Sequence, residues 1–411
     1  MGYRVEVFDR NLKRVGEIDE WISLDFTVRL AQEGSWQILI KDGTPQSDLI
    51  EKGGGVAIWQ NGVSKPLLSG EVDVFQKYWT KLQHTGPGSL YIGGKCHNTL
   101  AYRRLAFPDP GRPVNEQYLA PLAVRQWPDS GTAGEMVYEE LNQALGPGAR
   151  PDRRIAGLNF TPSSLGTGMA DSVRFDVIGS KLEEMFKGRN VAYRFIYNAR
   201  TQKVDVEIFQ PRDLSKEIRF SPELGNLREY IWTLNAPKAT RAIVGAAGEK
   251  LDRYYYQAID TESEAEWGRQ AEVFVDRRDI QLKVDRSTGQ PVKSEDSMTA
   301  DDVEAAKKAI QEAATGTLNE NQKSGNFQIY PIDTETCLFG RDYFVGDVVT
   351  VAVDGTEYSD VVREVSISVD DGGNALDVNP KIGMQGSGEP LNLYRTVYEM
   401  QRKLRKLEAR M

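Results

Sequence analysis

The sequence predicts an α+β fold that is mainly β, with strand-rich blocks at both ends of the globular region and helices between them. Apolar and polar residues alternate over residues 1–100, over 209–260 and over 326–383, which is the period of half-buried strands. Helical periodicity occurs instead within residues 101–208 and over residues 391–411. The fold class therefore rests on the spacing of the apolar side chains.

These patterns divide the chain into four expected regions. They are a first β domain (1–100 plus 209–235), an α+β insert (101–208), a second β domain (236–383, with a helical insertion at about 261–325), and a linker followed by a C-terminal helix (384–411). Five prolines break the start of the insert into loops. The linker is rich in glycine, which favours a flexible connection.

Individual elements follow from local signals. Apolar residues occupy every second position over 24–30 and over 36–40, with Gly34 in the turn between them, which predicts a hairpin. Thr132 followed by Glu135 forms a capping-box pattern and predicts the start of a helix. The remaining expectations are a helix over 177–186, a hairpin around 198–200, a short helix capped at Thr261, a longer helix from about Thr299, and a mobile polar loop at 283–298.

Residues 53–74 align without a gap on residues 346–367. Five of the 22 aligned positions are identical, among them the pairs Gly53/Gly346 and Gly62/Gly355. The similarity leaves two interpretations open. In the first it arises by chance, because any two β-hairpins share alternation and turn glycines. In the second, one β-barrel unit occurs twice in the chain, and a ring of three chains would present six similar units, since closed symmetric rings need equivalent contacts.

The C-terminal helix carries a heptad seam with spacings of 4, 3, 4, 3 and 4 residues. Its members are Leu393, Val397, Met400, Leu404, Leu407 and Met411. This spacing predicts a coiled coil between chains, and the alternative is a helix that packs on its own domain. Burying six such side chains contributes about 9–18 kcal/mol, whereas ordering the backbone of the segment costs roughly 20–40 kcal/mol. The seam is therefore expected to follow assembly rather than to drive it.

Composition narrows the function classes. Apolar residues make up 40% and charged residues 27%, as in ordinary soluble globular proteins. No run of about 18 apolar residues and no signal peptide is found, so folding in a cytoplasm is expected. The net charge of −9 argues against a nucleic-acid-binding surface but would let DNA slide past. Two distant cysteines, Cys96 and Cys337, are expected to be buried free thiols.

A cell-wall hydrolase is one alternative function. Histidine is scarce, with only His84 and His97, which disfavours acid–base chemistry near neutral pH. Cys96 and His97 are adjacent, so on a strand they would point to opposite faces. The pair Asp370-Asp371 is interpreted as a turn, although other carboxylate pairs stay open. No zinc motif is present, so we assign no catalytic, cofactor-binding or metal-ligating residue.

A carbohydrate- or receptor-binding module is the other alternative. Seven tryptophans could stack on sugars, but most lie in apolar strand patterns typical of a core. Trp79 and Trp127, which have polar neighbours in the sequence, are the best candidates for exposed binding residues. The glycine clusters at 53–55 and 93–95 lack phosphate-loop spacing and are interpreted as turns.

Several ordered motifs resemble the siphophage minor tail proteins of the Tal-like (tail-associated) hub family over most of residues 1–383. They are Trp21-Ile-Ser-Leu-Asp-Phe, Gly34-Ser-Trp-Gln-Ile, Leu68-Ser-Gly-Glu-Val-Asp, Leu90-Tyr-Ile-Gly-Gly-Lys, Leu100-Ala-Tyr-Arg-Arg, Phe220-Ser-Pro-Glu-Leu-Gly-Asn-Leu, Lys238-Ala-Thr-Arg-Ala-Ile-Val-Gly, and Arg341-Asp-Tyr-Phe-Val-Gly-Asp-Val-Val-Thr-Val with Val362-Arg-Glu-Val. Each motif is common by itself, and their order carries the resemblance.

The resemblance implies a baseplate hub, a virion structural protein of the tail tip that is assembled in the host bacterial cytoplasm. It implies two tail-tube-like β-barrel domains, smaller α+β domains, and a homotrimer. The implied partners are the distal tail protein ring and tail tube, tail fibres or receptor-binding proteins, and the tape-measure protein. DNA would pass through the ring without specific binding. The residues show no lytic domain, so no enzymatic activity transfers to this chain.

Overall fold

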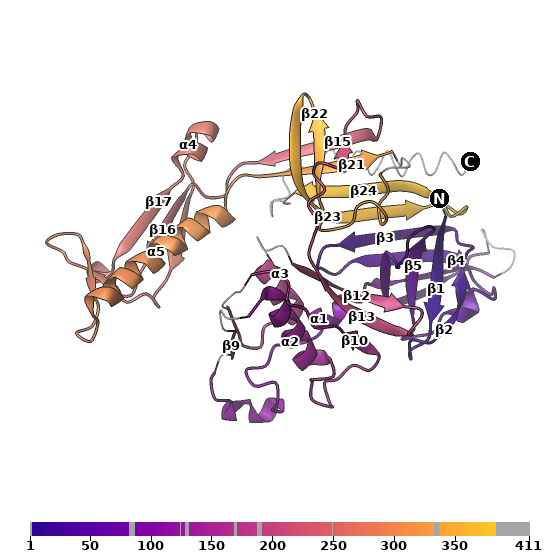
Figure 1. Cartoon of the computed structure of the whole chain (residues 1–411), viewed down its shortest axis with the longest axis horizontal. Helices are drawn as coiled ribbons and strands as arrows, with labels where there is room; N and C mark the ends of the chain where they lie inside the picture. The colour runs from indigo at the N-terminus through magenta and orange to yellow at the C-terminus, as the bar shows by residue number, and fades with distance from the viewer. Residues whose placement is uncertain are drawn as a thin grey trace. The chain divides into compact units, whose positions relative to one another are not determined.

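The computed structural model describes residues 2–81, 87–123, 125–127, 131–167, 171–186, 191–248, 250–332 and 337–383 (Figure 1). These residues form two units. The first contains the chain up to Ile231 together with Phe327–Gly383, and the second contains Trp232–Asn326. The chain is mainly β with fewer helices, which confirms the α+β fold class. The predicted linker and the six seam residues lie outside the described residues.

Two sheets dominate the first unit. The smaller has the order β2-β1-β5-β6 and is built from β1 (Tyr3–Phe8), β2 (Arg14–Ile18), β5 (Gly55–Gln60) and β6 (Leu68–Glu71). The larger has ten strands, and its main path runs β15-β21-β24-β23-β3-β4-β8-β7. Its strands are β3 (Ser23–Arg29), β4 (Ser35–Lys41), β7 (Val74–Tyr78), β8 (Ser89–Lys95), β15 (Leu227–Asn235), β21 (Ser324–Pro331), β23 (Thr356–Val369) and β24 (Ala375–Gly383), with β14 (Arg219–Phe220) and β22 (Val348–Val353) off this path. A 3-10 turn, η1 (Ser47–Leu49), follows β4.

The strand-rich blocks from the two ends of the chain share the larger sheet. β3 pairs antiparallel with β23, so that Phe26 lies opposite Ile367 and Val28 opposite Val365 (Figure 1). The predicted hairpin of residues 24–40 is confirmed as β3 and β4. The family resemblance implied two tail-tube-like β-barrel domains; no closed barrel is found among the described strands, which form open sheets.

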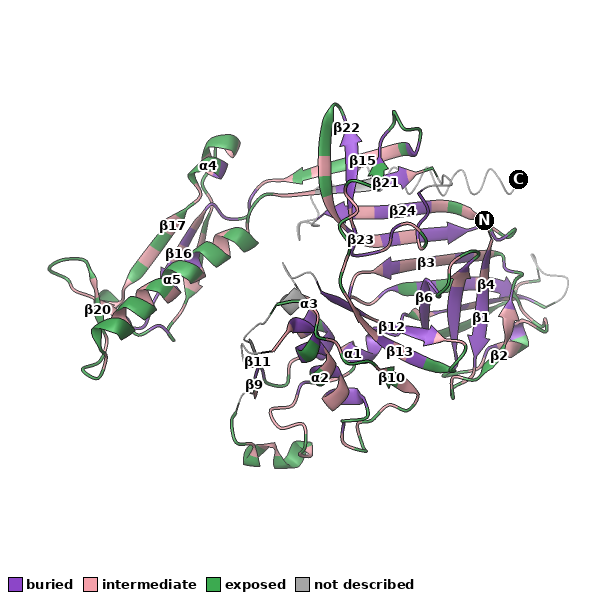
Figure 2. Ribbon diagram, in the orientation of Figure 1, coloured by how far each residue is buried: buried purple, intermediate pink, exposed green. Residues whose placement is uncertain are grey.

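The main core lies between these sheets because alternate residues of each strand point inward. In β3, Leu24, Phe26 and Val28 are buried while their neighbours are half-buried. Side chains from β1, β4, β5, β8, β22 and β23 join the same apolar cluster. Figure 2 shows the resulting band of buried residues along the strands of the first unit. Cys96 and Cys337 are both buried in this core, as expected, and form no disulfide bond with each other.

The aligned segments 53–74 and 346–367 both form hairpins that begin and turn at glycine. Gly53 and Gly346 have φ values of +80° and +100°, and Gly62 and Gly355 have +85° and +73°, a region that favours glycine. The strand registers differ, however. β5 pairs Ile58 with Leu68, whereas the equivalent Val351 of β22 pairs with Tyr358 because a shorter turn closes the second hairpin.

The insert packs a small sheet against two helices. Its sheet has the order β10-β13-β12, and its apolar residues form a second cluster. Its elements are α1 (Thr99–Tyr102), η2 (Val114–Leu119), β9 (Arg125–Trp127), α2 (Ala133–Leu145), β10 (Leu158–Phe160), β11 (Asp171–Val173), α3 (Ile178–Phe186), β12 (Ala192–Asn198) and β13 (Lys203–Phe209). The predicted capping box is confirmed, since Thr132 and Glu135 bond each other's backbone N–H groups at the start of α2.

The second unit covers one face of a three-stranded sheet with a long helix. Its elements are β16 (Arg241–Gly245), η3 (Lys250–Asp252), β17 (Tyr255–Ile259), α4 (Thr261–Trp267), β18 (Glu272–Asp276), β19 (Leu282–Val284), β20 (Pro291–Lys293) and α5 (Ala300–Glu320). The helix predicted near Thr299 is confirmed with its own capping box. Two expectations were wrong in detail: Asp260 rather than Thr261 caps α4, and part of the expected 283–298 loop pairs as the β19–β20 hairpin.

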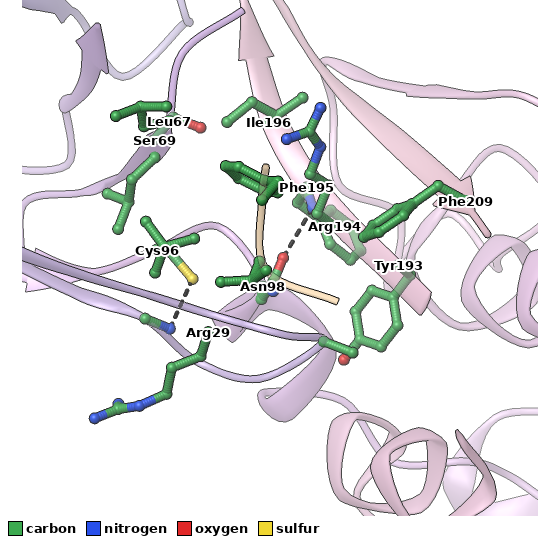
Figure 3. Close-up of a pocket in the computed structure, with 16 residues that line it drawn as sticks. Arg29, Leu67, Ser69, Cys96, Asn98, Tyr193, Arg194, Phe195, Ile196 and Phe209 are labelled. Carbon is green, nitrogen blue, oxygen red and sulfur yellow. Dashed lines mark hydrogen bonds between the residues drawn. The ribbon is translucent and has the colours of Figure 1, made fainter. Parts of the chain in front are cut away.

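Side chains of β6 and of the segment that precedes α1 hold the outer edge of the insert strand β12. The Phe195 N–H donates to Asn98 Oδ1 at 2.8 Å, and the Tyr197 N–H donates to Ser69 Oγ at 2.8 Å. Ser69 Oγ also lies 2.8 Å from His97 Nδ1. Figure 3 shows part of this joint, with Asn98 bonded to the backbone of β12, and there the Gly34 N–H also donates to Cys96 Sγ. The joint therefore satisfies backbone amides that a neighbouring strand would otherwise satisfy.

Burial, aided by the nearby Arg103 charge, lowers the pKa of His97 to about 3. Between pH 6.5 and about 3, His97 is protonated in the unfolded chain but stays neutral in the folded chain. The free energy of unfolding therefore decreases as the pH falls through this window. We expect a loss of about 1.5 kcal/mol between pH 6.5 and 5, measured by urea unfolding. The His97→Asn variant should lose this pH dependence. His84 is present in both the variant and the parent protein, so equal slopes of stability against pH in the two proteins would contradict the assignment to His97.

Candidate functional site

The larger sheet has one apolar and one polar face. Because side chains alternate along a strand, the β3 residues between the buried Leu24, Phe26 and Val28 point away from the main core. Their partners on the adjoining strands continue this surface. We define the polar face by Asp25, Thr27, Arg29, Gln37, Glu364, Ser366, Ser368, Asp377, Asn379 and Lys381, which come from β3, β4, β23 and β24.

Short polar side chains on this face bond one another across the strands. Thr27 and Ser366 lie opposite each other, with their hydroxyl oxygens 3.1 Å apart. Ser368 donates to Asp25 on the neighbouring strand, and Gln37 on the other side of Asp25 donates to it at 3.4 Å. These bonds satisfy Asp25, Thr27, Ser366 and Ser368 within the sheet plane, whereas Asn379 Oδ1 has no hydrogen-bond partner among the described residues. Ser368 and Asn379 are themselves buried, each 5% exposed.

The charges of the polar face are paired within it or with Arg228 of β15, which the charge network includes although it is not one of the residues that define the face. Glu364 accepts from Arg29 Nε at 2.5 Å and from Lys381 Nζ, so one carboxylate joins β3, β23 and β24. Burial alone would raise the pKa of Glu364, but the Lys381 and Arg29 cations outweigh it and hold the pKa below its usual value. Asp377 accepts from Arg228 of β15 at 2.9 Å.

The charged groups in this network therefore balance. Its acids are Asp25, Glu364 and Asp377, and its bases are Arg29, Lys381 and Arg228. A surface with no excess of one sign offers little attraction to a polyanion and little repulsion of it. The charge network therefore neither attracts nor repels a polyanion strongly.

The main path of the larger sheet ends at β7 and β15. All five residues of β7 are exposed, including Val74 at 45% and Phe75 at 38%. Among the described residues, β7 pairs only with β8, which leaves its outer edge without a strand. An exposed apolar edge strand is a template for pairing with another chain.

The other residues singled out from the sequence have mixed outcomes. Trp79 is 60% exposed, but Trp127 is buried in the insert core, so its prediction as an exposed stacking residue was wrong. Asp370 forms a turn, as predicted: its carboxylate accepts from the Asn374 N–H at 2.7 Å. Cys96 and His97 bond different groups, Gly34 and Ser69 respectively.

A hollow of about 520 Å³ lies beside the insert strand β13, and sequence reasoning missed it. It is lined by Lys65, Asn159, Thr161–Leu165 and Asp205–Phe209, and we call it the β13 hollow. Two carboxylates border it. Burial would raise the pKa of Glu207, but Arg194 and Lys65 outweigh it and lower the pKa, which makes Glu207 a poor proton donor for glycoside hydrolysis.

Metal-binding clusters and membrane-spanning helices are not found among the described residues. No cluster of three or more potential metal-ligating side chains occurs within them. Nor does any helix in the described ranges have the length and apolarity needed to span a membrane.

Solved structures place this fold among phage tail proteins. The chain is similar to the 43 kDa tail protein of prophage MuSo2 from Shewanella oneidensis, with 10% identity, a TM-score of 0.52, and 93% of this chain and 97% of that chain covered. It is equally similar to a tail protein of Neisseria meningitidis MC58, with 11% identity, a TM-score of 0.52, and coverages of 94% and 98%. A search among curated proteins finds no match.

The chain belongs to the Siphovirus ReqiPepy6 Gp37-like protein family, which matches residues 4–384. This family assignment spans nearly all of the described residues and confirms the resemblance to siphophage tail proteins that the sequence motifs predicted. The protein is therefore a phage tail component.

The charge network makes Glu364 important for stability. Glu364→Gln leaves the Arg29 and Lys381 cations without their shared carboxylate, and we expect a loss of about 2 kcal/mol in urea unfolding. Glu357→Gln is the matched control, because Glu357 pairs with Arg219 and both side chains are about half exposed. That variant should change stability by less than about 0.5 kcal/mol. Equal effects would contradict the role of the network.

Proposed function

We propose that this tail protein is a structural hub of the tail tip or baseplate, in which three copies form a ring that closes the tail tube. The ring anchors distal tail components and leaves a lumen for the tape-measure protein and DNA. One observation carries the proposal: a single chain joins its two strand-rich ends into one sheet with a charge-balanced polar face and an open apolar edge.

Ring closure would use the two ends of the sheet path. The β7 edge of one copy would meet the β15 edge of the next, a head-to-tail contact that closes when the rotation between copies returns to the start. Each contact would cover Val74 and Phe75, which are exposed in the single chain. The repeated hairpins β5–β6 and β22–β23 would then recur six times around the ring.

The polar face would line the lumen. Since its acids and bases balance, DNA phosphates would find no basic stripe to bind, and the overall charge of −9 would further oppose adhesion. The distal tail protein ring, the tail tube, and tail fibres or receptor-binding proteins are proposed partners on the outside. Two tail-tube-like barrel units, the four-region division of the chain, and assembly in the host cytoplasm remain predictions.

A receptor-binding module is the second candidate, and the exposed Trp79 favours it. An indole that is 60% exposed could stack on a sugar ring. Native mass measurement separates the two functions: a hub gives trimers, whereas a simple binding module would be monomeric. A monomer at every concentration would contradict the hub.

The two edges of unit one offer a matched test of closure. Val74→Lys places a charge on the β7 edge and should weaken the trimer at least about tenfold in dissociation constant, because the ammonium group would have to be buried. Val15→Lys is the control: Val15 lies on the edge strand β2 of the smaller sheet and is 42% exposed, against 45% for Val74. Light scattering over a dilution series measures both. Loss of the trimer in the control alone would contradict the proposed contact.

Deleting residues 391–411 tests the predicted seam of Leu393, Val397, Met400, Leu404, Leu407 and Met411. If these residues join chains, the deletion should shift the monomer–trimer equilibrium modestly, because so short a coiled coil adds to an assembly formed elsewhere. Analytical ultracentrifugation of the full chain and of the truncated chain gives the shift. An unchanged equilibrium at all concentrations would mean that the helix packs within its own chain.

A further inference from the structure

The β13 hollow lies where a sheet edge loses its neighbour. β10 pairs in parallel with β13 through Val204, Asp205 and Val206 only. Beyond this point the chain continues through Thr161–Leu165, while β13 runs on to Phe209 beside its other partner, β12. The space between these two segments is the hollow, so an unfilled strand position borders it.

The register of β13 shows which backbone groups face this space. The N–H groups of Phe195 and Tyr197 point away from β13, since they donate to Asn98 and Ser69. In an antiparallel ladder, the residue opposite such a position also turns its backbone N–H and C=O away from the partner strand. Val204, which lies opposite Tyr197, does so, since its N–H donates to the Gly157 oxygen. The same alternation turns the N–H and C=O of Ile208, opposite Tyr193, toward the hollow.

No strand or turn among the described residues provides a backbone partner for Ile208 on that side. Its amide and carbonyl are therefore offered in the geometry that an added strand requires. The hollow, at about 520 Å³, is within the usual range of ligand sites, roughly 300–1,000 Å³.

The charges around the hollow indicate the chemistry of an incoming strand. Glu207 is already neutralised by Lys65 and by Arg194, whose Nε donates to it at 2.8 Å. Asp205 instead accepts only amide hydrogens, from Asn159 at 2.8 Å and Asn198 at 2.7 Å, and no described basic side chain pairs with it. A cation brought by a ligand would therefore find its counter-charge at Asp205.

We propose that the β13 hollow binds an extended peptide segment of another protein, which adds a strand at Ile208 and places a lysine or arginine side chain near Asp205. Main-chain hydrogen bonds would give affinity, and Asp205 would select a basic residue at one position. A sugar is less favoured, because the groups that define the position are backbone donors and acceptors in strand register. The site does not depend on ring formation, so its failure and that of the hub would be distinct.

Selection of short random peptides on the purified full chain tests this proposal. We expect the enriched peptides to alternate apolar or hydroxyl residues with polar ones and to share one basic position. Ser164→Trp should raise the dissociation constant of the synthesised peptides at least about tenfold, because the indole would fill the hollow. Thr167→Trp is the matched control: it is an exposed position three residues away that does not line the hollow, and binding should change less than about twofold.

Two further variants separate the backbone from the charge. Two peptides would be compared, one N-methylated at its odd positions and one at its even positions. One should lose binding and the other should keep it, because only one edge of a bound strand forms hydrogen bonds with β13. Asp205→Asn should remove the preference for lysine over glutamine, while Asp152→Asn, a surface carboxylate elsewhere in the insert, should not. The proposal would be wrong if the selection enriched no peptide, or if the peptides bound Ser164→Trp as well as they bind the parent chain. It would also be wrong if the hollow bound a sugar instead, which would appear as chitohexaose binding that only Ser164→Trp abolishes.

Discussion

The pairing of β3 with β23 is the contact on which the rest of the structure depends. It joins residues 24–29 to residues 364–369 and so closes a loop that contains the insert and the second unit. The entropy cost of closing a loop rises only slowly with its length, so such long insertions are tolerated once they fold on their own. Without this pairing, β3-β4-β8-β7 and β15-β21-β24-β23 would be two separate small sheets.

The same register fixes both the core and the polar face. With Phe26 opposite Ile367 on one side, Thr27 must lie opposite Ser366 on the other. A slip by one residue would turn Glu364 and Arg29 into the apolar core, where their desolvation would cost far more than their attraction returns. The charged side chains of the polar face therefore also make the alternative strand register unfavourable.

Local elements could be predicted from the sequence, whereas contacts between distant segments could not. The β3–β4 hairpin and the caps at Thr132 and Thr299 depend on residues close in sequence. A single sequence does not show which strand β23 pairs with, so the pairing of β3 with β23 was not predicted. Trp127 was misjudged because the polar neighbour Arg125 lies 5.8 Å over its ring and pairs with the buried Glu140. The signal for the polar face was present in the Ser, Thr and Asp residues between the apolar positions of β3 and β23.

In the insert sheet, β12 and β13 each turn some backbone groups away from the other strand, and the chain treats the two sides differently. On β12, the outward amides of Phe195 and Tyr197 are satisfied by Asn98 and Ser69, so that edge is closed by side chains. On β13, the equivalent groups of Ile208 meet the hollow instead. Side chains of the same kind would be able to close β13 beyond the end of β10 as they close the outer side of β12. The open position at Ile208 is thus better explained by a strand that arrives from outside than by an incomplete fold.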